Sequence, residues 1–180
     1  EQEVYESITM EGMNHKYLPE HSLEGLEATM HVEEVLEGSE IIVLALPSSV
    51  ILNVVEDIIE HLRPGHVLLD LAKGLAPGKR LISEAIHQML NEKNMHNPLA
   101  VLTGPTIAPE AAGGVMTTAL VASEDMSVAE NLAATLTTPT FILHAASDPV
   151  GAELWGAFKN VVALACGLVD GLKQIGSLGG

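Results

Sequence analysis

The residues of this chain best suited to chemistry are a few lysines in unusual places. Lysine and arginine supply only 8 of the 180 residues, against 24 aspartates and glutamates. Lys159 is the single charged residue between Glu153 and Asp170, in the apolar stretch "GAELWGAFKNVVALACGLVDGL". Such a lysine ordinarily lays its methylene stem over apolar neighbours and reaches water with its ammonium. The alternative is a functional lysine. An ammonium brought into low dielectric is costly unless it is paired or its pKa falls, and a lysine whose pKa has fallen is chemically useful.

Further candidates follow the ends of apolar runs. Lys73 comes directly after the run 66–72, in "AKGLAPG", and is either a solvated loop lysine or a ligand-binding one. Gly104 and Thr106 belong to "TGPTIAPEAA", where the run 98–104 ends. The threonine can cap a short helix, and the free amides of that helix suit an anion or a polarised ligand oxygen. A role as a helix cap alone would also explain why a threonine stands at this position.

Metal and disulfide chemistry are not expected. Cys166 is the single cysteine, so it forms no internal disulfide, and its apolar surroundings predict a packing role in a reducing compartment. The histidines are scattered, without ligand spacing or a cysteine partner, and they are His15, His21, His31, His61, His66, His87, His96 and His144. A net charge of −16 argues against nucleic-acid and anionic-membrane partners, which need clustered lysine and arginine.

These candidates need a scaffold, and the hydrophobic pattern indicates one. Strands separated by crossover helices give a mostly parallel, doubly wound α/β sheet, which binds ligands at the carboxyl ends of its strands. A short strand and a helix are predicted over 27–39. Apolar runs predict the main strands, and helical spacing predicts the crossovers: the strands are 40–47, 66–72, 98–104, 117–123 and 139–146, and the helices are 49–62, 79–94 and 127–137.

A domain boundary is predicted within "ASDPVGAE" (146–153), where turn residues precede the long apolar segment. Residues 1–148 would form the later part of a dinucleotide-binding domain, and 149–180 the first, mostly buried helix of a helical domain. No G-x-G-x-x-G occurs, so a dinucleotide fingerprint would lie before residue 1. The missing initiator methionine and the end directly after a helix suggest an internal piece of a longer, soluble cytoplasmic protein, without stable membrane insertion.

Five segments together resemble the NAD(P)-dependent glycerol-3-phosphate dehydrogenases. In order, they are "NHKYLPEHSLEGLEAT", "VLALPSS", "LAKGL", "AVLTGPTIAPEAAGG" and "GAELWGAFKNVVALACGLVDGL". The resemblance implies an incomplete Rossmann-type sheet followed by the start of an all-helical domain. It also implies an oxidoreductase that interconverts dihydroxyacetone phosphate and sn-glycerol 3-phosphate with NAD or NADP, feeds glycerophospholipid synthesis and is a homodimer at full length. The fragment alone would be inactive.

The resemblance also assigns roles to residues. Lys159 would be the general acid/base at the substrate C2 oxygen, and Lys73 would contact both substrate and cofactor. Thr106 stands where many bacterial members carry serine, which preserves the hydroxyl. The remaining substrate contacts would be Gly104, Thr106 and Asn160, and the remaining cofactor contacts Ala108 and Pro47. No metal is implied.

Two other functions are compatible with the residues. The first is another β-hydroxyacid-type NAD(P) dehydrogenase, with a carboxylate in place of the phosphate, because a lysine and asparagine on a helix suit that wider group as well. The second is a non-catalytic truncated remnant retained for partner binding.

Overall fold

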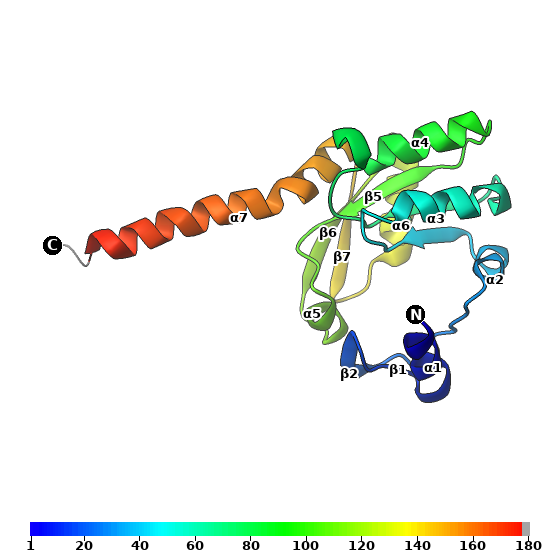
Figure 1. The fold of residues 1–180 in the computed structure, drawn as a ribbon, viewed down its shortest axis with the longest axis horizontal. Coiled ribbons are helices and arrows are strands. Elements are labelled where there is room, and N and C mark those ends of the chain that lie inside the picture. Colours follow the sequence, from blue (N-terminus) through cyan, green and yellow to red (C-terminus); the bar gives the residue numbers. More distant parts are fainter. Residues whose placement is uncertain (178–180) are drawn as a thin grey trace.

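The chain folds around a five-stranded sheet with the strand order β3-β4-β5-β6-β7 (Figure 1). The computed structural model describes residues 1–177. Each strand lies within one of the predicted apolar runs, which confirms the five main strands: they are β3 (Ile41–Leu44), β4 (Val67–Asp70), β5 (Leu99–Thr103), β6 (Thr117–Ala122) and β7 (Phe141–Ala146).

The sheet is mostly parallel, with one reversal. β3, β4 and β5 are parallel, β6 is antiparallel to β5, and β7 is parallel to β6. The reversal follows from the connection between β5 and β6, which contains only the short helix α5 (Ala108–Ala112). Five helical residues rise about 8 Å, whereas a five-residue strand spans about 17 Å. This helix therefore cannot return the chain to the far edge, and β6 begins where β5 ends.

Helices cover both faces of the sheet, as a doubly wound fold requires. Adjacent residues of β4 show the two faces, because successive strand side chains point in opposite directions. Leu68 packs in a core cluster with residues of α3 (Ile51–Ile58) and α4 (Ile82–Glu92). Leu69 packs in a second cluster with residues of α6 (Met126–Leu136). The three predicted crossover helices are confirmed, and short 3-10 turns follow α3 (η1, Ile59–His61) and precede α4 (η2, Pro77–Lys79).

The first forty residues differ most from the prediction. They contain helix α1 (Gln2–Glu11), a hairpin of β1 (Met13–Asn14) and β2 (Leu18–Ser22), and helix α2 (Val32–Gly38). The predicted helix within 27–39 is confirmed, and the predicted short strand there is wrong. Neither α1 nor the hairpin was predicted. Helix α1 fully buries no residue, and its few apolar side chains lie among glutamates, so its periodic signal is weak.

Helix α7 (Pro149–Ser177) begins at the predicted boundary and extends far from the sheet (Figure 1). The last three residues of the predicted 149–180 unit lie outside the described residues. The prediction of a mostly buried helix is wrong for residues 1–177: Trp155 is 70% exposed, Leu164 75% and Leu168 66%. By length and composition alone α7 could cross a membrane, although the core helix of a soluble protein passes the same test. An apolar sequence indicates that a helix is buried against something, but it does not identify the packing partner.

The β5–β6 pairing predicts a strong effect at Gly104. A β-carbon at this position would lie 2.9 Å from both Cα and Cβ of Ala119 on the neighbouring strand. We expect Gly104→Ala to lower the free energy of unfolding by about 1–3 kcal/mol, because the strands must separate to admit the methyl group. Urea denaturation of the chain followed by circular dichroism measures this change.

The matched control is Gly65→Ala, since a β-carbon at Gly65 meets no atom within 4 Å. That variant should be neutral or slightly more stable, because alanine reduces the conformational freedom of the unfolded chain. Equal stabilities for the two variants would contradict the close strand approach.

Candidate active site

Three predicted site residues meet in one cavity. It has a volume of about 420 Å³, and Lys73, Gly104 and Lys159 contribute to its lining. These residues come from the loop after β4, the end of β5 and helix α7. The cavity thus lies at the carboxyl end of β5, where a doubly wound sheet is expected to bind its ligand. Its other lining residues are Thr103, Pro105, Thr118, Ala119, Leu120, His144, Trp155 and Gly156.

The backbone before Lys73 is tied to the sheet. Asp70 ends β4 and is fully buried, and its Oδ1 accepts a hydrogen bond from the Ala72 amide at 2.8 Å. The Leu71 amide donates to the carbonyl of Leu44 on β3 at 3.2 Å. Lys73 follows directly, with its side chain exposed. The loop therefore starts from a fixed point and presents its ammonium at the cavity.

Helix α7 lies close to the sheet just before Lys159. A β-carbon at Gly156 would lie only 2.7 Å from Thr103 Oγ1, so the glycine lets the helix approach the end of β5. Asp148 Oδ1 accepts a hydrogen bond from the Gly151 amide at 2.8 Å and caps the first turn. Lys159 is itself exposed, because α7 leaves the sheet at this point. The described residues therefore supply the position of Lys159 but not the low-dielectric surroundings that the sequence suggested.

The other predicted site residues lie outside the cavity lining. The prediction that Thr106 caps α5 is wrong: the residue before this helix is Ile107, and it makes no side-chain cap hydrogen bond. Ala108 is the first residue of α5 and is exposed, and Asn160 is exposed beside Lys159 on α7. Pro47 is exposed, and its carbonyl accepts hydrogen bonds from the amides at the start of α3. The ligand contacts assigned to these residues stay predictions.

Several residues that line the cavity were not predicted from the sequence. His144 is an exposed residue in the middle of β7, paired in register with Leu120. Its signal was a polar side chain within an otherwise apolar strand, which a search for metal-ligand spacing does not detect. Thr103 and Thr118 place hydroxyl-bearing side chains on the lining, and Trp155 shares a helical face with Lys159. Strand order, which the sequence did not reveal, brings them together.

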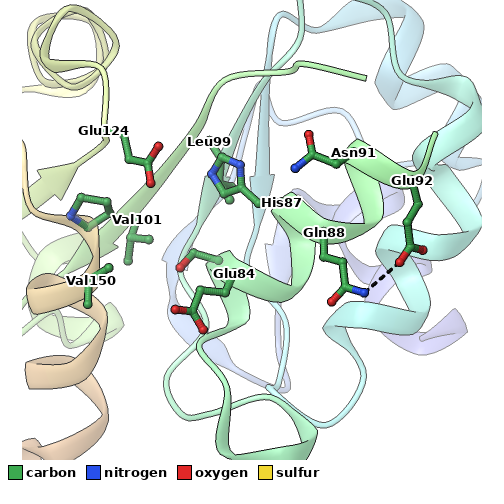
Figure 2. Close-up of a pocket in the computed structure, with 11 residues that line it drawn as sticks. Glu84, His87, Gln88, Asn91, Glu92, Leu99, Val101, Glu124 and Val150 are labelled. Atoms are coloured by element: carbon green, nitrogen blue, oxygen red, sulfur yellow. Dashed lines mark hydrogen bonds between the residues drawn. The ribbon is translucent and has the colours of Figure 1, made fainter. Parts of the chain in front are cut away.

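A second and larger cavity lies away from the lysines. It has a volume of about 530 Å³ and separates α4 from the first turn of α7 (Figure 2). Glu84 and His87 face it from α4, on which Gln88 donates a hydrogen bond to Glu92, and Val150 lies on the opposite side. In the part of the chain described, no group of three or more His, Cys, Asp or Glu side chains is arranged to hold a metal ion. None of the predicted site residues lines this cavity.

The electrostatics beneath Lys73 centre on Asp70. Burial raises the pKa of this carboxyl to about 7, the Ala72 amide opposes the shift, and the charge of Glu153 adds to it. Oδ2 is buried and has no hydrogen-bond partner in residues 1–177. A protonated oxygen here avoids the cost of an unpaired buried charge.

The cavity combines two ammonium groups, two threonine hydroxyls and an imidazole. Ammonium groups bind phosphate or an oxyanion and donate protons. The arrangement thus suits a small anionic substrate whose reaction includes a proton transfer to oxygen.

Comparison with known proteins identifies the family. The model for the N-terminus of NAD-dependent glycerol-3-phosphate dehydrogenases matches residues 1–129. The chain belongs to this family. The model for the C-terminus of the same glycerol-3-phosphate dehydrogenases matches residues 148–177. The sequence resemblance is confirmed, and with it the Rossmann-type fold.

Comparison with individual proteins of this dehydrogenase family gives the same assignment. The chain is 36% identical over 168 residues to the glycerol-3-phosphate dehydrogenase [NAD(P)+] of Halothermothrix orenii, which covers 93% of the chain and 48% of that protein. The crystal structure of the Coxiella burnetii glycerol-3-phosphate dehydrogenase superposes with a TM-score of 0.85 at 31% identity, covering 97% of this chain and 53% of that one. The Saccharomyces cerevisiae enzyme gives a TM-score of 0.79 at 27% identity, covering 95% and 51%. The chain therefore spans about half the length of these relatives.

The raised pKa of Asp70 predicts a pH-dependent stability. The carboxyl binds its proton more tightly in the folded state, at a pKa of about 7 against an ordinary value of 3.8. Its contribution to the free energy of unfolding should therefore fall as pH rises from about 4 to about 7, by on the order of 4 kcal/mol. Asp70→Asn keeps the acceptor for the Ala72 amide and removes the titration.

Urea denaturation at a series of pH values checks this sign. Wild type should lose stability relative to Asp70→Asn between these limits, and the difference should be constant above them. The same difference at every pH would contradict a buried carboxyl that takes up a proton. Glu130→Gln, an exposed substitution on α6, controls for the loss of one charge.

Proposed function

We propose that this chain supplies part of the active site of an NAD(P)-dependent glycerol-3-phosphate dehydrogenase. The reaction interconverts dihydroxyacetone phosphate and sn-glycerol 3-phosphate. The observation that carries the proposal is the meeting of Lys73 and Lys159 in one cavity, although they belong to a sheet loop and to a separate helix. The family match and the names of the relatives support the same reaction.

The described residues include part of a cofactor-binding site. The sheet edge at the carboxyl ends of β3, β4 and β5 is the nucleotide-binding edge of such a fold, and Pro47, Lys73 and Ala108 would contact the cofactor there. The glycine-rich pyrophosphate motif does not occur among the 180 residues. When bound, the nicotinamide supplies or accepts the hydride at the substrate C2 carbon.

Residues of this chain would transfer the proton and bind the substrate phosphate. In the reducing direction, Lys159 Nζ donates a proton to the C2 oxygen as the C2 carbon becomes tetrahedral, so that an alcohol forms without a free alkoxide. In the oxidising direction the same amine accepts that proton. Lys73 attracts the substrate and orients it, while Gly104, Thr106 and Asn160 would complete the substrate contacts.

We further propose that α7 opens a helical substrate domain after a dinucleotide-binding domain that ends at residue 148. Support comes from the start of α7 at Pro149 and from the separate family matches to residues 1–129 and 148–177. Its exposed apolar side chains would then pack against further helices of the same protein rather than enter a membrane. A cytoplasmic homodimer that feeds glycerophospholipid synthesis remains the expectation for the whole protein.

The alternatives separate in a direct assay. The protein expressed from the complete reading frame should oxidise NADH or NADPH when dihydroxyacetone phosphate is added. Turnover of a 3-hydroxy acid without turnover of the phosphate ester would assign it to another β-hydroxyacid-type enzyme. A folded protein without either activity would be a non-catalytic remnant.

The two lysines should have different kinetic signatures in that enzyme. Lys159→Ala should lower kcat by roughly 10²- to 10⁴-fold, the range for a positioned acid or base. Lys159→Met tests the same role with a side chain of similar volume. Lys73→Ala should raise KM for the phosphate substrate as well as lower kcat, because it removes a binding charge.

Lys173→Ala provides the matched control, since Lys173 is an exposed lysine on the same helix and does not line the cavity. Its steady-state constants should equal those of wild type. Full activity of Lys159→Met would remove Lys159 from the mechanism.

A further inference from the structure

Glu153 is a buried carboxylate whose contacts join two parts of the site. Only 3% of this residue is exposed, and it lies in the first turns of α7. Its Oε1 accepts a hydrogen bond from the Ile82 amide, and its Oε2 accepts from the Ser83 amide at 3.3 Å and from the Ser83 hydroxyl. Both donor residues open helix α4.

The start of α4 depends on this external carboxylate. Leu81 occupies the N-cap position, and a leucine side chain has no atom that accepts a hydrogen bond. Amides in the first turn of a helix have no intrahelical partner, and an anion near them is also favoured by the helix dipole. Glu153 therefore serves as the cap of α4 although it is supplied by another helix.

This contact closes a loop that begins at the sheet. The chain leaves β4 at Asp70, passes Lys73 and enters α4 at Ile82. Asp70 holds the first end through the Ala72 amide, and Glu153 holds the second end. Because Glu153 and Lys159 share α7, the same carboxylate connects the two lysine-bearing segments.

Packing between the two helices does not supply this connection by itself. The 530 Å³ cavity separates α4 from the beginning of α7 (Figure 2). Ser83 is part of its lining. A bridge of charge-assisted hydrogen bonds at the edge of that space can set the separation of the helices more sharply than apolar contacts across it.

We propose that Glu153 is a positioning residue that holds Lys73 and Lys159 at a fixed separation for the dehydrogenase reaction. The inference rests on the proposed function for its catalytic consequence, but the geometric part stands independently of it. A residue that serves only to stabilise the fold would leave the separation of the lysines unchanged in the folded variants.

The geometric part is tested without an activity measurement. The protein from the complete reading frame is treated with disuccinimidyl glutarate, a short amine cross-linker, and the Lys73–Lys159 product is quantified by peptide mass spectrometry. We expect a several-fold lower yield in Glu153→Ala than in wild type, with Lys173 modification as the internal standard. Hydrogen exchange of the Ile82 and Ser83 amides should become faster in the same variant.

Two further variants allow the same cross-linking measurement if Glu153→Ala does not fold. Glu153→Gln retains one acceptor oxygen and should recover much of the cross-linking yield. Ser83→Ala removes one donor and should give an intermediate yield. Wild-type yield in every folded variant would overturn the proposal.

The kinetic part uses a double-mutant cycle. Glu153→Ala should lower kcat/KM by about 10- to 100-fold, as expected for a small misplacement of reacting groups. The same substitution in a Lys73→Ala background should cost much less, because one of the groups to be positioned is already absent. Additive losses would indicate general destabilisation and contradict a positioning role, and Glu130→Gln again controls for charge.

The outcomes separate the two proposals. Wild-type protein without dehydrogenase activity would reject the proposed function, and the cross-linking yields would then decide the role of Glu153. An active wild type with unaltered yields and kinetics in Glu153→Ala would reject only the positioning role.

Discussion

A carboxylate buried away from water needs hydrogen-bond donors, and for Glu153 these donors include the first two backbone amides of helix α4. The energetic requirement is local, since a buried and unpaired charge is strongly unfavourable. Its structural effect is wider, because these hydrogen bonds join α7 to the start of α4. Gly156 and Thr103 then bring the next turn of α7 against β5. Thr103 and Gly156 also line the cavity that contains the two lysines.

The acidic composition gives these lysines a particular importance. With a net charge of −16, these 180 residues taken together repel anions. Binding of such anions therefore depends on a local reversal of sign, which Lys73 and Lys159 provide at the cavity. Asp70, directly below the Lys73 loop, would weaken that reversal if it were ionised, and its raised pKa reduces this effect near neutral pH.

Much of the fold could be predicted from sequence, because apolar runs and helical periodicity report burial directly. The main strands, the crossover helices and the start of α7 at Pro149 follow from these local signals. Lys73, Gly104 and Lys159, which line one cavity, could be chosen as candidates because lysines are scarce here and because the five motifs narrow the choice of family. Contacts between distant segments were harder to predict. His144 lies at the cavity only because of the strand order, and nothing in the sequence around Glu153 indicates that it caps another helix. Exposure of α7 was missed because the hydrophobicity of a segment does not identify its partner.

The exposed apolar surface of α7 also bears on how the polypeptide behaves in solution. The later turns of α7 extend away from the sheet (Figure 1), and Leu164 and Leu168 on this helix are exposed. Apolar patches of this kind drive association when nothing covers them. Residues 1–177 taken by themselves would thus behave as an amphiphile, with a globular acidic head and an apolar tail. Their solubility would depend on concentration and on added detergent more than on the stability of the sheet.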